Sequence, residues 1–478
     1  MGRNPPELSA RLRDLLKLPA FIDDLAKRFR AAGHELYLVG GSVRDALLGR
    51  TAARPDFDFA TDAKPDEVLQ LVSGWHEGKW LQGVEFGTVG VAKKGHRLEI
   101  TTFREERYAE GSRKPEVTPL PSIEADLARR DFTINAMAVR LPERTFIDPY
   151  EGALDLARKV LRTPGEPADS FSDDPLRMLR AARFVALVDV EPDAGVVRAM
   201  SEMRERLRIV SAERIRDELT KLLDTDRPSK GLDLATQTGL CEIFLPELPA
   251  LQLQQDPVHR HKDVYRHTLA VVDKIVATEP PGDRPDTALR MAGLLHDIGK
   301  PATRKIGPDG VSFHHHEVVG AEMARKRLQA LRFRSDFIDE VAELIALHLR
   351  FHTFRAGWSD SAVRRYVRDA GPLLDRLNRL VRSDSTTRNK MRARELSVAM
   401  DTLEERIARL AAEEDLKRIR PPLDGHEVMA YLGVKPGPIV GEALDHLLEI
   451  RLDRGEYSKE EAFALLDGWA RARGLTHP

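Results

Sequence analysis

Hydrophobic and polar residues follow two different patterns along the 478-residue chain. Between about residues 35 and 161, short strand-like apolar runs are mixed with helical stretches. Beyond about residue 170 the strand-like runs disappear, and helical patterns follow one another at residues 174–187, 196–207 and 211–223. The pattern predicts an α+β N-terminal domain with a mixed or antiparallel sheet, followed by a long all-α remainder.

Helical stretches are also predicted at the N-terminus and in the C-terminal part of the chain. The first 33 residues predict two short helices, with Ser9 as a candidate N-cap of the first and Gly33 as the end of the second. Further on, apolar residues step by four and three through residues 396–410. This stripe is typical of a short coiled coil or of an ordinary packed helix. Fewer than three heptads are present, which favours the packed helix.

The composition excludes several classes of protein. Lys and Arg total 75 and Asp and Glu total 77, so the formal net charge is −2. This balance excludes a globally basic coat for nucleic acid, although a local basic cluster can still bind phosphate. The single cysteine, Cys241, indicates a reducing compartment. Because the chain has neither a membrane-length apolar segment nor an N-terminal signal core, we expect a cytoplasmic protein without a membrane partner. The sequence does not predict the oligomeric state.

A glycine pair follows the first strand-like run. Residues 36–39 are apolar and lead into Gly40-Gly41, after which Ser42 is placed to cap a helix. Two residues without side chains let a phosphate approach the backbone, and Arg44 can add a charge-assisted hydrogen bond. The alternative is a tight strand-to-helix turn that binds no ligand.

Two aspartates alternate with phenylalanines shortly afterwards, in residues 56–61 (DFDFAT). A strand here would project Asp56 and Asp58 from one face and bury Phe57 and Phe59 on the other. Like charges side by side repel, and a divalent cation resolves that repulsion. Carboxylate oxygens suit Mg²⁺, and two such ions promote in-line phosphoryl transfer. A solvated strand edge is the alternative, but the nearby glycine pair favours Asp56 and Asp58 as catalytic metal ligands.

A third carboxylate comes from the next predicted hairpin. Strands at residues 87–91 and 98–103 flank a Lys-Lys-Gly turn, and Glu99 lies on the face opposite its apolar neighbours. Two outcomes remain open for Glu99, because it either completes the metal site or forms a cross-strand pair with a lysine.

The glycine-pair and aspartate motifs together closely resemble the signature of the class II, bacterial-type CCA-adding tRNA nucleotidyltransferases of the polymerase-beta superfamily. Three later motifs follow in the family's order. Residues 129–136 (RRDFTINA) resemble its ribose-recognition motif, residues 173–177 (DDPLR) its nucleobase-reading motif, and residues 211–215 (SAERI) the start of its neck helix. Asp173 stands where the family often has Glu, which is a conservative difference. The resemblance covers roughly residues 35–225, far more than one short motif.

The resemblance implies a head, neck, body and tail, and addition of C, C and A to the 3′ end of tRNA from CTP and ATP without a nucleic-acid template. It implies that Asp56 and Asp58 hold Mg²⁺. The nucleotide-binding set that it implies is Gly40, Gly41, Arg44, Arg130, Asp131, Asp174, Arg177, Arg180 and Arg183. The expected domains are N-terminal helices (1–34), head (35–165), neck with RNA and nucleotide binding (166–250), HD domain (251–390) and helical tail (391–478).

The residues of the nucleobase motif support the same role by themselves. Arg177, Arg180 and Arg183 recur every three residues on one side of the predicted helix, with Asp174 one turn earlier. A carboxylate and a guanidinium together accept from an exocyclic amine and donate to ring nitrogens or a carbonyl. Cytosine and adenine carry that amine, whereas uracil and guanine would oppose like groups. The alternative is a solvated helix face held by i,i+3 ion pairs.

A polar stretch at residues 104–123 lies between a predicted strand and a predicted helix. Its length resembles the family's flexible loop, which enzymes that add only CC tend to lack. This favours complete CCA addition and leaves A-only addition open. A bacterial poly(A) polymerase, which shares the head and neck, is the nearest rival.

Many of the 15 histidines crowd between residues 259 and 352. Residues 294–300 (LLHDIGK) resemble the core of HD phosphohydrolases, with His296 and Asp297 joined by His267 upstream and Asp384 downstream as candidate ligands. Imidazole and carboxylate without thiolate suit Mn²⁺, Fe²⁺, Ni²⁺ or Mg²⁺, and such a metal would activate water for phosphate-ester hydrolysis. A metal-free helical domain is the alternative, and an HD phosphohydrolase with an RNA-binding head is a rival function. The HHH run at residues 314–316 either contributes a second metal or only lines the cleft.

Near the C-terminus, residues 433–441 (GVKPGPIVG) resemble a helix-hairpin-helix turn, whose backbone amides can face phosphates. A plain turn between two helices explains the same residues. Contact with the tRNA backbone is therefore one of two interpretations of this segment.

Overall fold

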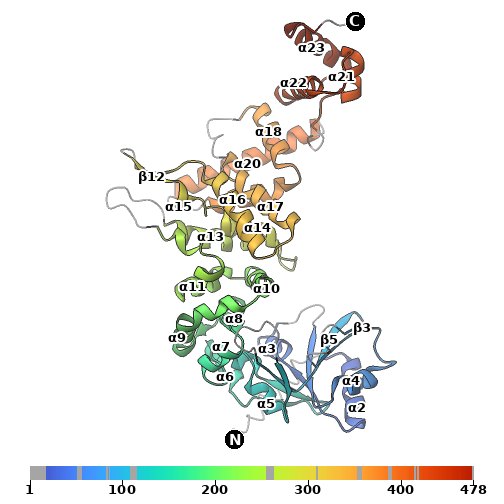
Figure 1. Cartoon of the computed structure of the whole chain (residues 1–478), viewed down its shortest axis with the longest axis vertical. Helices are drawn as coiled ribbons and strands as arrows, with labels where there is room; N and C mark the ends of the chain where they lie inside the picture. The colour runs from blue at the N-terminus through green and yellow to red at the C-terminus, as the bar shows by residue number, and fades with distance from the viewer. Residues whose placement is uncertain are drawn as a thin grey trace. The chain divides into compact units, whose positions relative to one another are not determined.

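The computed structural model describes residues 18–50, 56–81, 84, 87–107, 116–253, 263–307, 310–351, 358–385, 390–413, 416 and 419–475. The chain divides into two compact units (Figure 1), Met1–Pro249 with Ala330–Arg332 and Ala250–Gln329 with Phe333–Pro478. Ser9 and the first of the two expected N-terminal helices lie outside the described residues. The division into five domains remains a prediction.

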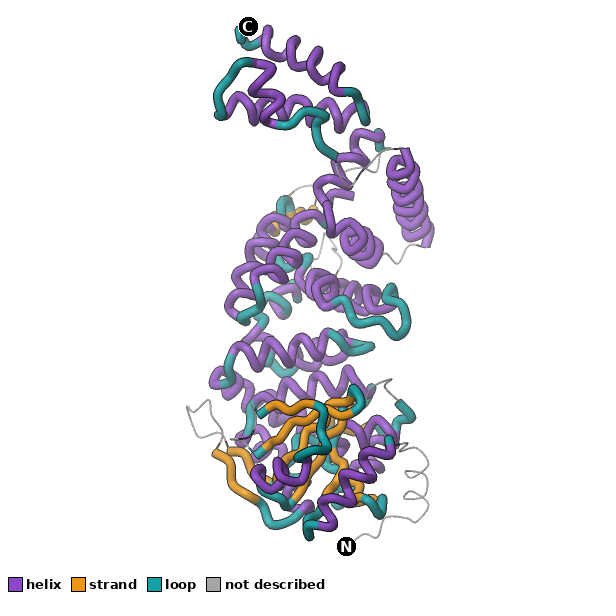
Figure 2. The backbone as a smooth tube through the Cα atoms, turned by 90° about the vertical axis from the view of Figure 1, so that its right-hand side faces the viewer, coloured by secondary structure: helices purple, strands orange, loops and turns teal. Residues whose placement is uncertain are grey.

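A seven-stranded sheet organises the first unit (Figure 2). Its order is β3-β4-β5-β2-β1-β8-β9, and all neighbours are antiparallel except β2 and β5, which run parallel. The predicted mixed sheet is therefore confirmed. Its strands are β1 (Leu36–Val39), β2 (Phe57–Thr61), β3 (Gly78–Trp80), β4 (Thr88–Lys93), β5 (His96–Thr102), β8 (Ala138–Leu141) and β9 (Thr145–Ile147). Two further ladders pair β6 (Arg104–Arg107) with β7 (Glu116–Pro119), and β10 (Val160–Leu161) with β11 (Glu191–Pro192).

Alternation along β2 separates a buried face of the sheet from a polar one. Phe57 and Phe59 are 4% and 1% exposed, whereas Asp58 is exposed on the opposite face. Ala60 shares that face with Asp58 and packs toward helix α5 (Ile123–Ala128). The predicted alternation is confirmed, with one correction: Asp56 lies one residue before the strand begins.

Helix α2 (Ala20–Ala31) forms where the sequence predicts the second N-terminal helix. Gly33, with a φ of +85°, turns the chain out of the helix toward β1. The residues that form the buried stripe of α2 are Phe21, Ile22, Leu25, Ala26 and Phe29. The other head helices are α3 (Gly41–Leu47), α4 (Pro65–Val72) and α6 (Gly152–Arg158).

Helix α8 (Leu176–Val188) forms where the sequence predicts a helix over residues 174–187, and a further helix, α7 (Pro167–Asp173), precedes it. The break falls at Asp174, whose backbone is extended (φ −143°, ψ 102°), because Pro175 disfavours the helical conformation for the residue before it. The Asp174 carboxylate accepts a hydrogen bond from the backbone N–H of Leu176 (3.1 Å) at the start of α8. The expectation that Asp174 lies one turn before Arg177 on the same helix is therefore wrong.

Helix α8 packs against the helices that follow it in the first unit. A Cβ on Gly231 would lie 2.3 Å from the carbonyl oxygen of Ala182, so this close approach of α11 (Pro228–Gln237) to α8 requires glycine. Ser211 caps α10 (Ala212–Leu223) by accepting from the N–H of Arg214 (3.4 Å), as the predicted boundary requires. The helices after α8 are α9 (Ala194–Met203), a 3₁₀ segment (Arg204–Ile209), α10 (Ala212–Leu223), α11 (Pro228–Gln237) and α12 (Cys241–Phe244).

Within its described residues, the second unit is helical except for a hairpin of β12 (Arg304–Gly307) and β13 (Gly310–Phe313), which the all-α prediction missed. The helices of its first part are α13 (Val264–Ala277), α14 (Thr287–Leu295), α15 (Lys300–Thr303), α16 (His316–Ala330), α17 (Ser335–Leu347), α18 (Asp360–Ala370) and α19 (Leu374–Asp384). The helices that follow are α20 (Lys390–Glu413), α21 (Gly425–Leu432), α22 (Pro438–Arg454) and α23 (Lys459–Ala472).

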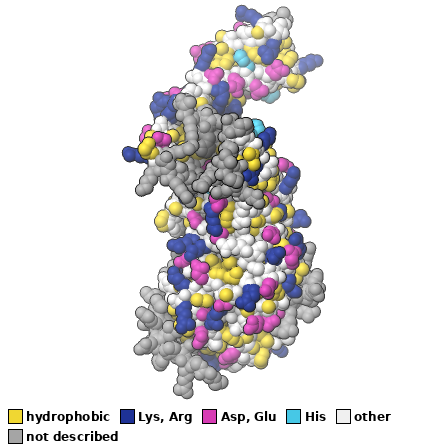
Figure 3. Space-filling view, turned by 90° about the vertical axis from the view of Figure 1, so that its left-hand side faces the viewer, with side chains coloured by type: hydrophobic (Ala, Val, Ile, Leu, Met, Phe, Trp, Pro, Cys, Tyr) yellow, Lys and Arg dark blue, Asp and Glu magenta, His cyan; other side chains and the backbone are white. Residues whose placement is uncertain are grey.

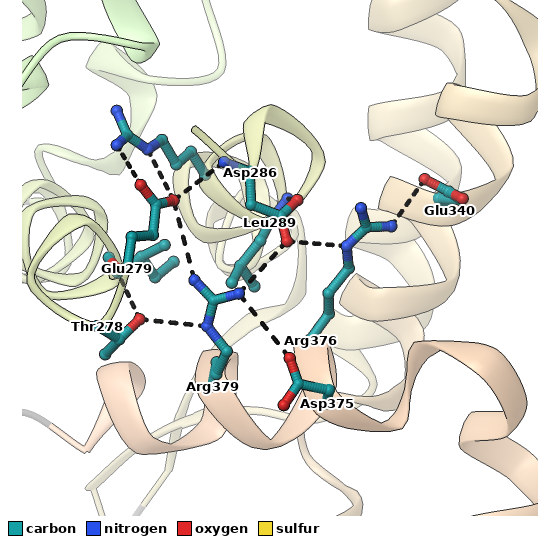
Figure 4. A network of polar contacts seen from close by, with 10 residues as sticks. Thr278, Glu279, Asp286, Leu289, Glu340, Asp375, Arg376 and Arg379 are labelled. Atoms are coloured by element: carbon teal, nitrogen blue, oxygen red, sulfur yellow. Dashed lines mark hydrogen bonds and ion pairs between the residues drawn. The ribbon is translucent and has the colours of Figure 1, made fainter. Parts of the chain in front are cut away.

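A polar network joins α13, α14, α17 and α19 (Figure 4). Asp286 caps α14 through a backbone hydrogen bond (3.3 Å), and its second oxygen accepts from Arg376 (2.9 Å) and Arg379 (3.4 Å) of α19. Arg376 also donates to Glu340 of α17 (3.0 Å), and Arg379 donates to Thr278 at the end of α13 (3.3 Å). The network therefore fixes the helices that lead into the predicted HD ligands.

The predicted stripe along α20 is that of a packed helix. Leu396, Met400, Leu403 and Leu410 are all buried. Beyond it, α21, α22 and α23 surround a core of their own. The segment at residues 433–437 is a turn between α21 and α22, and its contact with tRNA stays a prediction.

Charged side chains of both signs are interspersed on the face of the molecule drawn in Figure 3. This mixture agrees with the formal net charge of −2. No helix among the described residues combines the length and the apolar character needed to cross a membrane.

Asp286→Ala should lower the free energy of unfolding of the second unit by about 2–3 kcal/mol, because it removes a helix cap and a partner of two partly buried arginines. Asp375→Ala is the control. Asp375 is 86% exposed and lies 3.9 Å from Arg379, so its loss should cost no more than about 0.5 kcal/mol. Denaturant unfolding followed by circular dichroism measures both variants, and equal losses would contradict the role of the network.

Candidate active site

Asp58 and Glu99 lie side by side on the polar face of the sheet. The parallel register pairs them directly, and Gly90, not a lysine, stands opposite Glu99 on β4. Desolvation within the cavity that Asp58 lines and the charge of Glu99 raise the pKa of Asp58, with Asp56 adding to the shift and Arg130 opposing it. A carboxylate whose charged form is disfavoured gains from a bound cation. The register therefore supports the first of the two outcomes predicted for Glu99.

Asp56 stands at the entrance to β2 with an exposed side chain. It is not among the described residues that line the adjacent cavity, although its charge reaches Asp58. The backbone oxygen of Asp56 accepts a hydrogen bond from Ser42 Oγ (3.1 Å). The prediction that Ser42 caps α3 is wrong, because Gly40 occupies the N-cap position and Ser42 already lies within the helix.

Gly40 brings the backbone against the predicted metal and phosphate ligands. Its φ of +67° and ψ of −131° favour glycine over every other residue. A Cβ at this position would lie 3.3 Å from Arg130 Nη1 and 3.8 Å from Asp58 Oδ2. A phosphate bound at this turn would therefore be within reach of a guanidinium and of the carboxylate pair.

These residues line a cavity of about 630 Å³. Eight guanidinium groups face four carboxylates in its lining, an excess of positive charge that suits a polyphosphate. The basic residues of the lining are Arg44, Arg104, Arg129, Arg130, Arg177, Arg180, Arg183 and Arg214. The acidic residues are Asp58, Glu99, Asp131 and Asp174.

Two residues that the sequence reasoning missed, Asp126 and Asn135, hold three of these arginines. Asp126 is 1% exposed and accepts from Arg129 (2.8 Å) and Arg130 (3.1 Å). Burial raises the pKa of Asp126, but the two arginines outweigh it and hold that pKa below its usual value. The Asn135 side-chain oxygen accepts from Arg44 (2.8 Å). The i,i+3 and i,i+4 spacing after Asp126 was the available signal in the sequence.

Buried carboxylates also hold the arginines of α8. Asp131, predicted to contact sugar or phosphate, accepts from Arg180 (2.5 Å) and from the Asn135 amide (3.0 Å). Burial raises the pKa of Asp131, but Arg180 and Asn135 hold it well below its usual range. Glu218 of α10 pairs with Arg183 (2.5 Å). Asp131 therefore orients Arg180, and its contact with a nucleotide stays a prediction.

An aromatic ring supports the same arginines. The Phe184 ring lies 5.3 Å from the Arg44 guanidinium, 5.5 Å from that of Arg180 and 4.6 Å from that of Arg183. Phe184 itself packs edge to face on Phe132 (5.6 Å). Cation–π attraction therefore adds to the ion pairs that position this part of the cavity.

Asp174 and Arg177, the predicted base-reading residues, both line the cavity but have other partners. Asp174 Oδ2 accepts from Arg214 of α10 (2.7 Å). Arg177 donates to Ser170 Oγ (2.9 Å) and to the backbone oxygen of Arg129 (2.6 Å). Arg214 was not among the predicted site residues, although it belongs to the neck motif that the sequence contains.

The four predicted HD ligands come together in the second unit. His267 Nε2 on α13 lies 2.8 Å from Asp384 Oδ1 at the end of α19, and 3.6 Å from Asp297 Oδ2. His296 Nε2, just after α14, lies 3.2 Å from the same Asp297 oxygen. His267, His296 and Asp297 form a group of donor atoms that could hold a metal ion. Lys300 also donates to Asp297 Oδ2 (2.7 Å).

Two further buried histidines adjoin this group. His316 Nε2 lies 3.4 Å from Asp297 Oδ1, and the rings of His316 and His348 are 5.4 Å apart. The other two histidines of the HHH run are exposed. Burial lowers the pKa of His348 to about 3. Burial also acts to lower the pKa of His296, but Asp297 and Asp384 raise it to about 10.

Comparison with known proteins adds three matches to family profiles. Residues 36–162 match a Poly A polymerase head domain, residues 189–251 a probable RNA and SrmB-binding site of polymerase A, and residues 264–413 an HD domain. An A-adding tRNA nucleotidyltransferase from Deinococcus radiodurans is 35% identical over 444 residues, which cover 91% of this chain and 95% of the relative. The chain belongs to the tRNA nucleotidyltransferase family.

Further members of the tRNA nucleotidyltransferase family resemble the whole chain. A CC-adding tRNA nucleotidyltransferase from Thermus thermophilus is 33% identical and covers 92% of this chain and 94% of its own length. The crystal structure of the Bacillus stearothermophilus CCA-adding enzyme in complex with CTP matches with a TM-score of 0.70 at 25% identity and covers 99% of both chains. The expected family and fold class are therefore confirmed, and the chain is a nucleotidyltransferase.

A tRNA nucleotidyltransferase head implies a divalent metal, and the residues present in this head fit one. Asp58 and Glu99 present oxygen donors on one face, and desolvation in the cavity and the charge of Glu99 raise the pKa of Asp58. Oxygen-only donors that leave room for water and phosphate are typical of Mg²⁺ sites.

Gly40→Ala should reduce nucleotide incorporation by this nucleotidyltransferase about 10²-fold, because the new methyl group displaces Arg130 or the turn itself. Gly49→Ala is the control, since Gly49 has the same φ of +67° but no atom within 4 Å of the added Cβ. Nucleotide incorporation into tRNA and thermal unfolding are measured on both variants. Together they distinguish an effect on the active site from a loss of stability caused by backbone strain. Equal activities per folded molecule would contradict the role given to the turn.

Proposed function

We propose that the protein adds CCA to the 3′ end of tRNA, using CTP and ATP and no nucleic-acid template. The observation that carries the proposal is the Asp58–Glu99 pair beside the Gly40 turn in a cavity rich in arginine. A carboxylate pair for cations, next to fixed cations for phosphates, is what transfer from a nucleoside triphosphate requires.

In the proposed reaction, the 3′-hydroxyl of tRNA loses its proton to solvent, and its oxygen bonds to the α-phosphorus of the nucleotide. The bond from that phosphorus to the bridging oxygen breaks, and pyrophosphate leaves. Mg²⁺ held by Asp56, Asp58 and Glu99 would supply the charge that activates the hydroxyl and neutralises the leaving group. Gly40 and Gly41 admit the triphosphate, which the arginines of the cavity bind. Because buried acceptors already fix several of these arginines, little reorganisation accompanies binding.

Selection of the base is assigned to Asp174 and Arg177, with Arg214 as an additional contributor. Asp174 supplies acceptors for the exocyclic amine of cytosine or adenine, and Arg177 supplies donors. The Arg214–Asp174 ion pair (2.7 Å) supports including Arg214, because Arg214 contacts the carboxylate that is proposed to bind the base.

A-only addition is the second candidate, and the relative from Deinococcus radiodurans favours it. The polar segment at residues 104–123 argues against CC-only addition and leaves A-only addition open, whereas the CCA-adding enzyme that aligns over 99% of the chain favours complete CCA addition. A poly(A) polymerase shares the head but would extend RNA without a defined end.

The second unit gives the protein a second candidate activity. His267, His296, Asp297 and Asp384 would bind a divalent metal such as Mn²⁺, Ni²⁺ or Mg²⁺ and hydrolyse phosphate esters as an accessory reaction. The clustering of the four side chains supports this proposal.

Purified protein should extend tRNA that lacks CCA by C, C and A, and then stop. Sequencing the product after CTP alone, ATP alone and both nucleotides tests this prediction. Addition of A only to tRNA ending in CC would support the second candidate, and a long A tail would indicate a poly(A) polymerase. Asp58→Asn is the matched control: it should lower incorporation by about 10³-fold or more while tRNA binding persists. Normal turnover by this variant would contradict the metal assignment.

Asp174→Ala should retain chemistry but lose selectivity, lowering the preference for CTP and ATP over UTP by about 10²-fold. The ratio of kcat/KM values for the nucleotides measures this change. Asp173→Ala is the control, since the neighbouring carboxylate belongs to α7 and does not line the cavity. An unchanged preference in Asp174→Ala would remove Asp174 from base selection.

A further inference from the structure

The polar face of the sheet continues beyond Glu99 to the edge strand β3. The register places Asp58, Glu99, Gly90 and Trp80 in one row across β2, β5, β4 and β3. Side chains in such a row project from the same face, because directly paired residues point to the same side of a sheet. Trp80 therefore shares the face of the carboxylate pair, and only the position of Gly90 separates it from Glu99.

Gly90 lets the Trp80 ring lie across β4. A Cβ on Gly90 would lie 2.0 Å from both Cε2 and Nε1 of the indole, so the ring occupies the space that a side chain at position 90 would fill. Gly90 is buried, whereas Trp80 is half-buried. Directly opposite residues have Cβ atoms about 5 Å apart, so the indole begins roughly that far from the base of the Glu99 side chain. An aromatic ring is thus held next to the predicted metal ligands.

Arg97 lies against the same ring. It is on the same face of β5 as Glu99, two residues away, and its guanidinium carbon lies 4.7 Å from the centre of the Trp80 ring. Arg97 is exposed, and among the described residues no ion pair joins its guanidinium to a carboxylate. Its positive charge is therefore available to a phosphate.

The two ends of the row face different surroundings. On one side of β2 lie β1 and the Gly40 turn, which belong to the arginine-rich cavity proposed for the triphosphate. On the other side of the carboxylate pair lie β4 and β3. Trp80 does not line the cavity, but Thr88 of β4 does, so the ring lies near the rim of the cavity. Because the attacking and leaving oxygens lie in line on opposite sides of the phosphorus, the acceptor approaches from the side of β4 and β3.

We propose that Trp80 is the stacking site for the base of the last nucleotide of the tRNA, the nucleotide whose 3′-hydroxyl attacks. Arg97 leaves the ring and binds the phosphate of that nucleotide, because base–aromatic stacking is stronger than an exposed cation–π contact. This inference rests on the proposed transfer to tRNA and deepens it by placing the acceptor. Base and hydroxyl belong to one nucleoside, so a ring next to Glu99 can hold the base while the hydroxyl meets the metal ligands.

Stacking suits an acceptor that changes during the reaction. In the proposed addition, the last base is first that of the unextended tRNA and then each added C. Every base has a π-face, so an aromatic ring binds all of them, whereas fixed donors and acceptors would favour one base. Trp80 therefore holds the acceptor without selecting it, and selection of the incoming base stays assigned to Asp174 and Arg177.

A fluorescent base at the end of the tRNA tests the stacking directly. 2-Aminopurine, placed as the last nucleotide of tRNA that lacks CCA, should be quenched by the indole when the full chain binds at saturating concentration. Trp80→Leu and Gly90→Val should each lose this quenching and lower kcat/KM for tRNA about 10-fold, while KM for CTP changes less than about 2-fold. Trp80→Phe should retain most of kcat/KM. Gly78→Ala is the matched control, because its Cβ would lie 3.6 Å from Ala92 Cβ, an ordinary contact.

Thermal unfolding of the same variants separates stacking from a purely structural role. Lower melting temperatures with unchanged quenching and unchanged kcat/KM for tRNA per folded molecule would overturn the inference. A rise in KM for CTP instead would place Trp80 beside the incoming nucleotide and overturn its assignment to the acceptor. The wild-type chain decides even if a variant does not fold, because absence of quenching at saturation would overturn the stacking site. Failure to extend the bound, quenched tRNA would contradict the proposed function and not the site.

Discussion

The head depends on two like charges kept side by side. Asp58 and Glu99 occupy directly paired positions on parallel strands, where their repulsion opposes folding. The opposite face of the same strands fixes this register, because Phe57 and Phe59 are buried there beside apolar residues of β5. A slip of one residue would turn the phenylalanines outward and the carboxylate inward. Hydrophobic burial on one face therefore maintains an unfavourable electrostatic arrangement on the other.

The arginines around that pair are also held in place, by buried acceptors. Asp126, Asp131, Asn135 and Glu218 each accept from or pair with an arginine of the cavity and lie at or below 8% exposure. Long flexible side chains would otherwise lose rotamer entropy when a nucleotide binds. Because the buried partners order them in advance, the cavity presents a fixed field of positive charge, as the proposed binding of a triphosphate requires.

Sequence reasoning succeeded where the signal was local and failed where it depended on tertiary contacts. Period-two alternation is sufficient to place Asp58 on the polar face, and the family-like motifs name most of the arginines. The start of α8 at Leu176 was missed, although Pro175 carries its cause, because the arginine spacing suggested that the helix already included Asp174. The partners of Asp174 and the place of His348 beside Asp297 depend on packing between distant helices, which no spacing reveals.

The Asp174–Arg214 ion pair engages the same carboxylate to which the proposed function assigns base selection. In the proposed role, a base that binds at Asp174 must either displace the arginine or share the carboxylate with it. A partly exposed pair of this kind contributes about 1 kcal/mol, which is less than a factor of ten in affinity. If Asp174 selects the base, as we propose, a base with matching groups would compensate for the loss of this ion pair, whereas a mismatched base would not. Discrimination would then begin before any nucleotide is fully bound.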